Sequence, residues 1–252
     1  MELKGKTLIV TGASSGIGAA AALLFAAEGA AVVLGARRGA ELDRIAGQIN
    51  QSNGRAVALA GDVREDGYAE ALVALAESEY GGLDGAFNNA GIVGAMHPVP
   101  EMPAADWSDT IATNLTSAFH AARAQIPALR RRGGGGIVFT ASFVGHSNGG
   151  LPGMGAYAAS KAGMLGLVQA LAAEHAAENI RVNALLPGGT VTEAMGEMDA
   201  ETEAFIAGLH PMKRMASARE IAQAALFMLS DRASFMTGSP VPVDGGMSVR
   251  LV

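Results

Sequence analysis

The segment Thr7-Leu8-Ile9-Val10-Thr11-Gly12-Ala13-Ser14-Ser15-Gly16-Ile17-Gly18 decides the fold. Its apolar start predicts a strand buried on both faces, and the alanine-rich residues that follow have the spacing of a helix. Glycines in the turn between them let the backbone come close to a ligand, and the amino end of a helix favours negative charge. The unit therefore predicts a site for a dinucleotide pyrophosphate. Its spacing, Gly-x-x-x-Gly-x-Gly, differs from the common Gly-x-Gly-x-x-Gly, and by itself it also fits a plain turn.

The same alternation of strand and helix continues along the chain. The apolar runs that predict buried strands are Thr7–Val10, Ala31–Leu34, Ala56–Ala60, Leu83–Phe87, Ile137–Thr140, Ile180–Leu186 and Pro240–Val243. The segments with helical spacing are Ile17–Ala27, Ala40–Asn50, Tyr68–Glu79, Trp107–Leu129, Tyr157–Ala176 and Arg219–Leu229. This order predicts an α/β fold with a single doubly wound parallel sheet of the Rossmann type and helices on both faces. No linker or repeat divides residues 1–252, so we expect one domain.

Residues 188–217 break this rhythm, because they join a strand to a helix without clear periodicity. Segments of that length inside compact domains usually carry function or move, so we expect a substrate loop here. Apolar residues in and near it predict an adaptable apolar pocket, although they fit the packing of the loop or of a subunit contact equally well. They are Met154, Met195, Met198, Phe205, Leu209, Met212 and Met215.

Composition excludes several function classes. The net charge of -6 provides no positive field for nucleic acid or anionic lipid, and the one basic cluster, Arg130–Arg132, fits a solvated helix end. The absence of cysteine excludes disulfides and thiolate metal sites. We find neither a signal peptide nor an apolar run long enough to span a membrane, and therefore expect a cytoplasmic protein without a metal. The histidines show no metal-ligand spacing, and we expect most of them at the surface or a pocket rim: His97, His120, His146, His175 and His210.

A serine, a tyrosine and a lysine form the candidate catalytic group. Ser142 follows a predicted strand, while Tyr157 and Lys161 lie four residues apart on one face of the next helix. A neighbouring ammonium is expected to lower the pKa of a phenol, which could then exchange a proton with a carbonyl or alcohol oxygen. Ser142 would hydrogen-bond the same oxygen. Ser147 is the competing serine, but it lies beyond the strand end.

Polar residues also follow the third and fourth predicted strands. Asp62-Val63 comes after one and Asn88-Asn89-Ala90-Gly91 after the other. The carboxyl ends of parallel strands meet their ligand at one edge of the sheet, so both segments are candidates for cofactor contact. A capping aspartate and a simple turn are the alternative interpretations.

The ordered set of motifs resembles a classical short-chain dehydrogenase/reductase from Leu3 to the end of the chain, including 3-oxoacyl-carrier-protein reductases and carbonyl reductases. The matching motifs are Thr11-Gly12-x-x-x-Gly16-x-Gly18, Asn88-Asn89-Ala90-Gly91, Asn114, Ser142, Tyr157-x-x-x-Lys161 and Pro187-Gly188. In one departure, Ser142 lies fifteen residues before Tyr157, slightly farther than usual. The extra residues fall within the glycine-rich segment Gly145–Gly155, which affects the shape of the substrate pocket more than the catalytic group.

The resemblance implies an oxidoreductase that moves a hydride between NADP(H) and a ketone or secondary alcohol. It implies a tetrad of Asn114, Ser142, Tyr157 and Lys161, in which Asn114 holds a water beside Lys161. Implied cofactor contacts, besides Tyr157 and Lys161, are Gly12, Ser14, Ser15, Gly16, Ile17, Gly18, Arg37, Arg38, Asp62, Val63, Asn89, Ala90, Gly91, Pro187, Gly188, Thr190 and Thr192. A catalytically idle dinucleotide-binding or redox-sensing protein of the same fold is the alternative.

The end of the second predicted strand favours NADP(H) over NAD(H). NAD-specific enzymes place a carboxylate there, where it binds the ribose hydroxyls and repels a 2′-phosphate. Ala36 occupies that position, and Arg37 and Arg38 follow it. A guanidinium binds phosphate through two parallel hydrogen bonds. Arg37 is the better candidate for the phosphate, and Arg38 for stacking on the adenine.

The resemblance also implies a homotetramer, because family members of this size usually pair two long helices across subunits. Those helices correspond to Trp107–Leu129 and Tyr157–Ala176. Small residues that would allow their close approach are Ala121, Ala122, Ala162, Gly163 and Gly166. The physiological substrate does not follow from the sequence.

Overall fold

The structure is a computed structural model that describes residues 1–147, 150–193 and 199–249. The strands are β1 (Thr7–Thr11), β2 (Ala31–Ala36), β3 (Arg55–Ala60), β4 (Gly85–Asn88), β5 (Gly135–Thr140), β6 (Ile180–Pro187), β7 (Thr190–Val191), β8 (Ala216–Ser217) and β9 (Pro240–Val243). The α-helices are α1 (Gly16–Ala27), α2 (Gly39–Gln51), α3 (Tyr68–Tyr80), α4 (Ala104–Ile111), α5 (Ser117–Arg132), α6 (Gly155–His175), α7 (Ala200–Leu209) and α8 (Ala218–Leu229).

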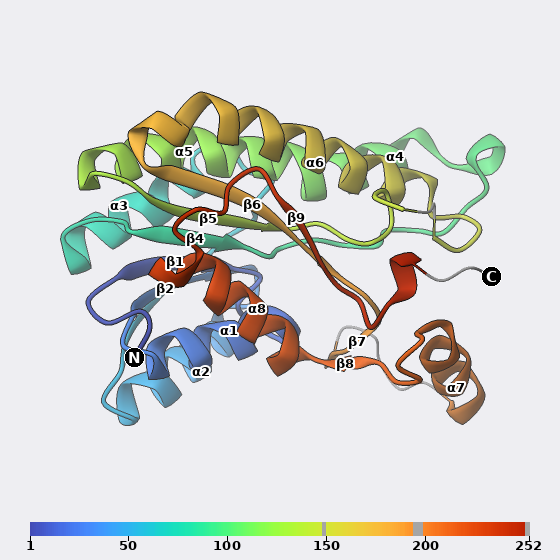
Figure 1. Ribbon diagram of the computed structural model, residues 1–252, viewed down its shortest axis with the longest axis horizontal. Coiled ribbons are helices and arrows are strands. Elements are labelled where there is room, and N and C mark those ends of the chain that lie inside the picture. The colour runs from blue at the N-terminus through green and yellow to red at the C-terminus, as the bar shows by residue number, and fades with distance from the viewer. Residues whose placement is uncertain (148–149, 194–198, 250–252) are drawn as a thin grey trace.

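Seven parallel strands form the central sheet in the order β3-β2-β1-β4-β5-β6-β9. Helices α1, α2 and α8 cover one face, and α3, α4, α5 and α6 cover the other (Figure 1). Each face holds its own apolar core, with Phe25 and Leu34 in one and Phe139 and Val182 in the other. The predicted doubly wound parallel sheet is confirmed.

The order of the strands reverses between β1 and β4, and this switch point is where open α/β sheets bind their ligands. The register pairs Thr11 with Asn88 there. The glycine-rich turn after β1 and the segment Asn88–Gly91 after β4 therefore lie side by side at the carboxyl edge. β5 and β6 end at the same edge and bring Ser142 and Pro187 to it.

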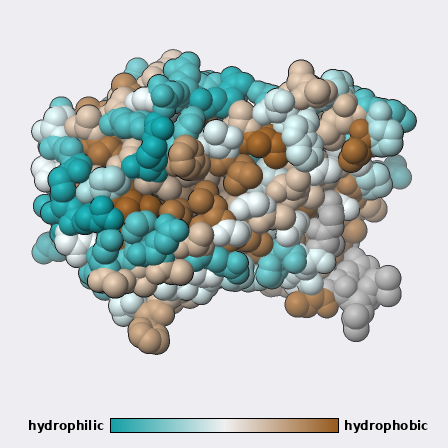
Figure 2. Space-filling model, turned by 90° about the horizontal axis from the view of Figure 1, so that it is seen from above, coloured by the Kyte–Doolittle hydropathy of each residue, from teal (hydrophilic) through white to brown (hydrophobic). Residues whose placement is uncertain are grey.

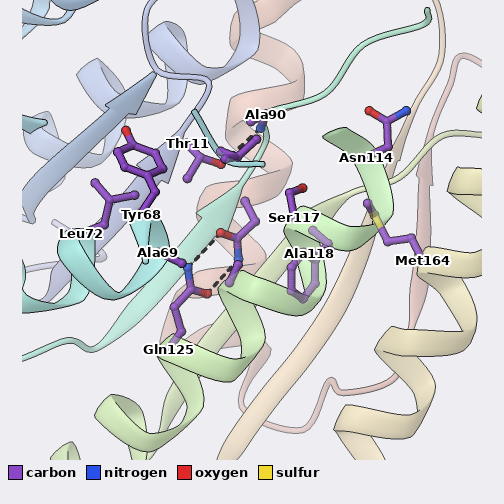
Figure 3. Close-up of a pocket in the computed structure, with 14 residues that line it drawn as sticks. Thr11, Tyr68, Ala69, Leu72, Ala90, Asn114, Ser117, Ala118, Gln125 and Met164 are labelled. Carbon is purple, nitrogen blue, oxygen red and sulfur yellow. Dashed lines mark hydrogen bonds between the residues drawn. The ribbon is translucent and has the colours of Figure 1, made fainter. Parts of the chain in front are cut away.

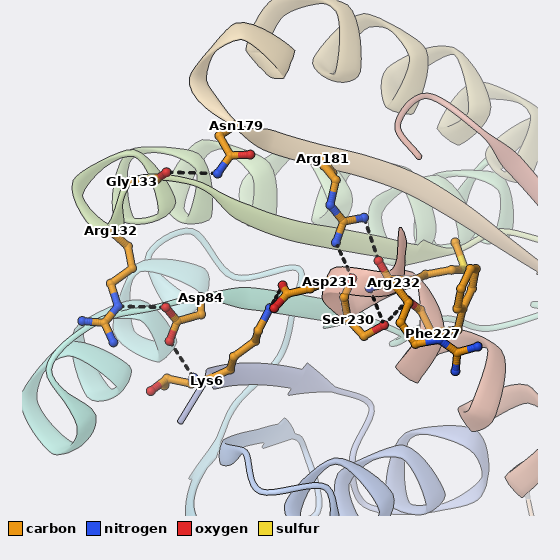
Figure 4. A network of polar contacts seen from close by, with 12 residues as sticks. Lys6, Asp84, Arg132, Gly133, Asn179, Arg181, Phe227, Ser230, Asp231 and Arg232 are labelled. Carbon is orange, nitrogen blue, oxygen red and sulfur yellow. Dashed lines mark hydrogen bonds and ion pairs between the residues drawn. The ribbon is translucent and has the colours of Figure 1, made fainter. Parts of the chain in front are cut away.

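A network of charged side chains lies at the opposite, amino edge of the sheet (Figure 4). Arg132 Nε donates to Asp84 Oδ1 over 2.8 Å, and Lys6 pairs with Asp231. Arg181 donates to the carbonyls of Met228 and Ser230, and burial lowers the pKa of its guanidinium. Each arginine of the basic cluster Arg130–Arg132 pairs with an acidic side chain, which fits the solvated helix end that the sequence indicated.

Two predicted elements differ in the structure. The helix expected over Trp107–Leu129 begins at Ala104 and contains a π-helical turn at Ala112–Thr116, where an extra residue in the turn has no signature in the periodicity. The substrate loop contains helix α7, which the sequence analysis missed. This helix buries none of its residues, so the apolar spacing by which we predicted the other helices is absent. The remaining sequence signal for α7 was Asp199, an N-cap residue whose side chain accepts from Thr202 N over 2.7 Å.

A buried amide pair joins β4 to α5 behind the switch point (Figure 3). Asn88 Nδ2 donates to Gln125 Oε1 over 2.8 Å, and Gln125 Nε2 donates to Asn88 Oδ1 over 2.9 Å. Both side chains are buried. The pair borders a cavity of ≈ 20 Å³ that Thr11 and Ser117 also line, a volume that holds roughly one water.

Replacing Gln125 with leucine is expected to lower the free energy of unfolding by about 1–3 kcal/mol, because the buried Asn88 amide then loses both partners. Urea unfolding measures this change. Gln48→Leu, on the exposed face of α2, is the matched control and should change the stability by less than about 0.5 kcal/mol. Equal stability of Gln125→Leu and wild type would show that the pair contributes nothing.

Among the described residues, no helix combines the length and the apolar character needed to cross a membrane.

Candidate active site

The glycines of the phosphate-binding turn let its backbone pack closely against its neighbours in the chain. A Cβ added to Gly18 would lie 2.2 Å from the Gly12 carbonyl oxygen, and one added to Gly12 would lie 3.0 Å from Ala90 Cα. Gly12 also has a φ of 66°, a conformation that favours glycine. The turn is tied to β2 because Ala13 N donates to Gly35 O over 3.2 Å. This backbone cradle fits a pyrophosphate at the amino end of α1.

The segment after β4 is held against the same turn. The hydroxyl of Thr11 accepts from Asn89 N over 3.1 Å and from Ala90 N over 3.2 Å. Thr140 Oγ1 donates to Asn89 Oδ1 over 3.2 Å. A Cβ on Gly91 would lie 3.1 Å from Asn114 Oδ1 and 3.4 Å from Lys161 Nζ. Gly91 therefore gives this segment close access to the candidate catalytic side chains.

Ser142, Tyr157 and Lys161 converge at the carboxyl edge. Ser142, just beyond β5, is buried, and its side chain interacts with the phenol of the half-buried Tyr157 near the start of α6. Lys161 Nζ lies 5.6 Å from the centre of the Tyr157 ring and donates to Thr140 O over 2.7 Å. The competing Ser147 is exposed, and its hydroxyl faces the Phe143 carbonyl. The geometry therefore joins Ser142, and not Ser147, to the tyrosine.

Asn114 lies in the π-helical turn between α4 and α5. Its side chain accepts from Ile92 N over 2.9 Å and donates to Ile92 O over 2.8 Å. Its amide also donates to Ser160 Oγ over 3.0 Å, one residue before Lys161. The Asn114 side chain thus fastens the segment after β4 to α6. Such turns occur often at functional sites.

Burial dominates the electrostatics of the pair Tyr157 and Lys161. It raises the pKa of the Tyr157 phenol above its ordinary value, and the hydrogen bond with Ser142 only partly opposes this. The sequence-based expectation that Lys161 lowers the pKa of the phenol is therefore wrong for the chain by itself. Burial also lowers the pKa of Lys161 to about 8. At neutral pH Tyr157 carries its proton and can donate it.

The lowered pKa of Lys161 predicts a pH dependence of stability. Between about 8, where Lys161 titrates in the folded chain, and 10.5, its ordinary value, the unfolded chain binds more protons than the folded one. The free energy of unfolding should therefore rise with pH across this window, by up to about 3 kcal/mol relative to Lys161→Met. Urea unfolding at a series of pH values measures the difference. For Lys213→Met, at an exposed lysine, the plot of unfolding free energy against pH should be parallel to that of wild type. If the plot for Lys161→Met were also parallel to that of wild type, the prediction would be contradicted.

Arg38 reaches over the glycine-rich turn from the end of β2. Its Nη2 donates to Ser15 Oγ over 2.6 Å and to Ser14 Oγ over 3.1 Å. Arg37, in contrast, helps to lower the pKa of Asp62. Arg38 therefore lies closer to the phosphate-binding turn, whereas the sequence analysis favoured Arg37 for the phosphate.

Asp62 is engaged by its own neighbour. Arg64 donates to both of its carboxylate oxygens, and Arg64 N donates to Oδ1 over 3.0 Å. These hydrogen bonds hold the pKa of Asp62 below its usual value. These hydrogen bonds thus hold the Asp62 side chain in place at the carboxyl edge of the sheet.

Comparison with known proteins identifies the family. Residues 12–248 match a family model described as enoyl-(acyl carrier protein) reductase. The cyclohexanol dehydrogenase of Acinetobacter sp. (strain SE19) is 37% identical over 97% of this chain and 95% of its own length. The 2,5-dichloro-2,5-cyclohexadiene-1,4-diol dehydrogenase of Sphingobium indicum (strain B90A) is 39% identical over 98% of both chains. A solved short-chain type dehydrogenase/reductase from Mycobacterium marinum has a TM-score of 0.93 and 34% identity, over 99% of this chain and 98% of that one.

The chain belongs to the short-chain dehydrogenase/reductase family. The resemblance drawn from the sequence motifs is confirmed, and this short-chain dehydrogenase/reductase is therefore an oxidoreductase.

The segment after β6 lies on the other side of the turn. Gly188 N donates to Val243 O over 3.1 Å, and Thr190 Oγ1 donates to Gly188 O over 3.0 Å. Thr192 packs on the glycine-rich turn, because a Cβ on Gly16 would lie 3.1 Å from Thr192 Cβ. The residues expected to border the cofactor on this side, Pro187, Gly188, Thr190 and Thr192, thus form one strip along the carboxyl edge.

The apolar residues expected to close over the substrate divide into three groups. Phe205 and Met212 are exposed, and Met154 and Leu209 are partly exposed. Met215 is buried. Met195 and Met198 lie outside the described residues.

Sequence analysis missed a second group of exposed apolar residues near Tyr157. The loop 92–103 of the short-chain dehydrogenase/reductase meets residues 150–154 in front of α6, where a Cβ on Gly153 would lie 3.0 Å from the Met96 backbone. Their exposed apolar side chains are Val93, Met96, Val99 and Leu151. No periodicity marked these residues, because the loops meet only in the folded chain.

Proposed function

We propose that this short-chain dehydrogenase/reductase interconverts a cyclic ketone and its secondary alcohol with NADP(H). The observation that carries the proposal is the convergence of Ser142, Tyr157 and Lys161 beside the glycine cradle at the switch point. An idle dinucleotide-binding protein needs only the cradle. The placement of Ser142 and Lys161 around Tyr157 argues for the enzyme.

The cradle fits a nicotinamide dinucleotide, since Gly12 and Gly18 let the amino end of α1 pack close to the segment after β4 at the switch point, and the amino end of a helix favours the negative charge of a pyrophosphate. When bound, the cofactor supplies or accepts the hydride. Tyr157 donates its proton to the substrate oxygen in reduction and removes it in oxidation. Ser142 donates a hydrogen bond to the same oxygen, and Lys161 offers its buried ammonium close to the phenol. Asn114 keeps the segment after β4 in place.

A preference for NADPH is supported by the end of β2. Ala36 has no carboxylate to repel a 2′-phosphate, and the Arg38 guanidinium lies beside the hydroxyls of Ser14 and Ser15. We propose that Arg38 contacts the phosphate and that Arg37 adds positive charge from the side of Asp62.

A cyclic substrate without charge is supported by the apolar loops in front of Tyr157 and by the relatives. Val93, Met96 and Val99 expose apolar surface, and Val99 lies against Gly155 at the start of α6, two residues before Tyr157. The two relatives named above carry six-membered rings in the names of their substrates. A 3-oxoacyl thioester is the second candidate, favoured by a further relative, the 3-oxoacyl-[acyl-carrier-protein] reductase of Thermotoga maritima, which is 35% identical over 99% of this chain.

A steady-state screen tests the proposal. Cyclohexanone and a 3-oxoacyl thioester are each offered with NADPH and with NADH. The highest kcat/KM is expected for cyclohexanone with NADPH. A higher value for the thioester would favour the second candidate, and tight NADPH binding without turnover of a broad carbonyl panel would favour the idle binding protein.

We also propose a homotetramer that works in the cytoplasm. Apolar surface gathers over the face formed by α4, α5 and α6 (Figure 2), where Trp107 and Phe119 are exposed. Of the small residues expected to line this contact, Ala162, Gly163 and Gly166 are exposed. Ala121 and Ala122 are buried within the subunit and cannot take part. The absence of cysteine suits a reducing compartment.

A further inference from the structure

His210 departs from the other histidines of the chain. We expected most histidines at the surface or a pocket rim, but its side chain is 1% exposed. It directly follows α7, and its ring packs between the strip after β6 and the turn after β9. Each of three glycines would bring an added Cβ within 3.3 Å of the imidazole ring: Gly188, Gly189 and Gly245.

Both ring nitrogens of His210 have backbone partners that fix its tautomer. Gly189 N donates to Nε2 over 3.0 Å, so Nε2 carries no proton. Nδ1 lies 2.9 Å from the carbonyl oxygen of Ile206, which can only accept, so Nδ1 carries the proton. The neutral ring thus links a carbonyl of α7 to an N–H of the strip after β6.

We infer that His210 is a positioning residue that holds Gly189, and with it the cofactor-facing strip Gly188–Thr192, against helix α7. Gly189 is fixed from its other side as well, because its carbonyl accepts from Ala216 N over 2.9 Å. The strip continues to Thr192, which packs on Gly16 of the phosphate-binding turn. His210 touches none of the proposed reacting atoms. Its effect should reach the cofactor through the backbone that it holds.

The inference rests on the proposed cofactor site and predicts a split between binding and chemistry. Replacing His210 with phenylalanine keeps a ring but removes the acceptor for Gly189 N. NADPH should bind about tenfold more weakly and its KM should rise by a similar factor, because a hydrogen bond of the cofactor-facing strip is lost. At saturating NADPH, kcat should remain within about twofold of wild type, since Ser142, Tyr157 and Lys161 are untouched.

Two polar variants separate positioning from simple packing. His210→Gln places a side-chain oxygen near the former Nε2 and should recover most of the NADPH affinity. His210→Asn reaches only the former Nδ1 position and should bind NADPH as weakly as His210→Phe. Glu203→Gln, at an exposed residue of α7, should match wild type. NADPH dissociation constants, steady-state constants and unfolding midpoints are measured for all variants.

Wild-type NADPH affinity in His210→Phe would overturn the inference, as would equal losses in the glutamine and asparagine variants. A loss of kcat with unchanged NADPH binding would overturn it too. Failure of the proposed function is distinguishable, because the wild-type chain itself would then either fail to bind NADPH or bind it without turning over a ketone.

Discussion

Replacing Tyr157 with phenylalanine is expected to lower turnover by about 10²- to 10⁴-fold, the range typical of general acid–base catalysis. The substitution removes only the phenolic hydroxyl, so the ring still packs at the start of α6. Cofactor affinity should remain nearly intact, because the glycine cradle and Arg38 lie on other elements. Steady-state kinetics with NADPH, together with direct NADPH binding, measures both quantities.

Tyr80→Phe is the matched control for this loss, since Tyr80 lies at the end of α3 and should tolerate the same change. Ser142→Ala and Ser147→Ala form a second pair, of which only the first should lower turnover. The role given to Tyr157 would be wrong if its variant kept more than about a tenth of wild-type turnover while chemistry limits the rate.

The second large effect is expected at the end of β2. Ala36→Asp combined with Arg38→Ser should lower the ratio of NADPH to NADH efficiency by about 100-fold or more. The aspartate repels a 2′-phosphate, and the lost arginine removes a charge-assisted contact that contributes roughly 1.5–3 kcal/mol. The kcat/KM values for the two cofactors, measured at one ketone concentration, give the ratio.

The matched comparison is Ala36→Asp combined with Arg37→Ser. If Arg38 is the principal phosphate ligand, this pair should shift the ratio less than the pair with Arg38→Ser. A larger shift would show that Arg37 is the principal ligand of the 2′-phosphate, as the sequence alone indicated. Equal or better efficiency of the wild-type chain with NADH would contradict the preference for NADPH and leave the ketone chemistry standing.

The sheet could be predicted from the sequence because each of its strands is an apolar run. The inner strands β2, β1, β4, β5 and β6 are buried, whereas the edge strands β3 and β9 are mostly half-exposed, contrary to the expectation that every strand is buried on both faces. The glycine-rich turn and the segment Asn88–Gly91 could be placed at one edge because parallel strands end together there. Helix α7 could not be found in this way, since an exposed helix leaves no apolar stripe. The π-helical turn at Asn114 could not be predicted either, because the extra residue in the turn changes the backbone hydrogen bonds of the helix but leaves no recognisable pattern in the sequence.

The pKa shifts in the candidate active site could not be predicted without knowledge of the fold. Spacing along α6 places Lys161 near Tyr157, and a charge pair was the natural interpretation. Burial of both groups depends on loops from distant parts of the chain, and it raises the pKa of the phenol. The choice between Arg37 and Arg38 likewise depends on side-chain direction at the end of β2. The role of His210 depends on two backbone partners that its sequence neighbours do not reveal.

Hydride transfer itself is the most direct test of the central claim. The chain is incubated with cyclohexanone and NADPH that carries deuterium at C4 of the nicotinamide, on each face in turn, and the alcohol is analysed by mass spectrometry. With one of the two labelled cofactors, the account predicts one deuterium on the carbinol carbon of the product, and it predicts no labelled alcohol from Tyr157→Phe in the same time. Alcohol without deuterium from both labelled cofactors, or equal labelling by Tyr157→Phe, would contradict it.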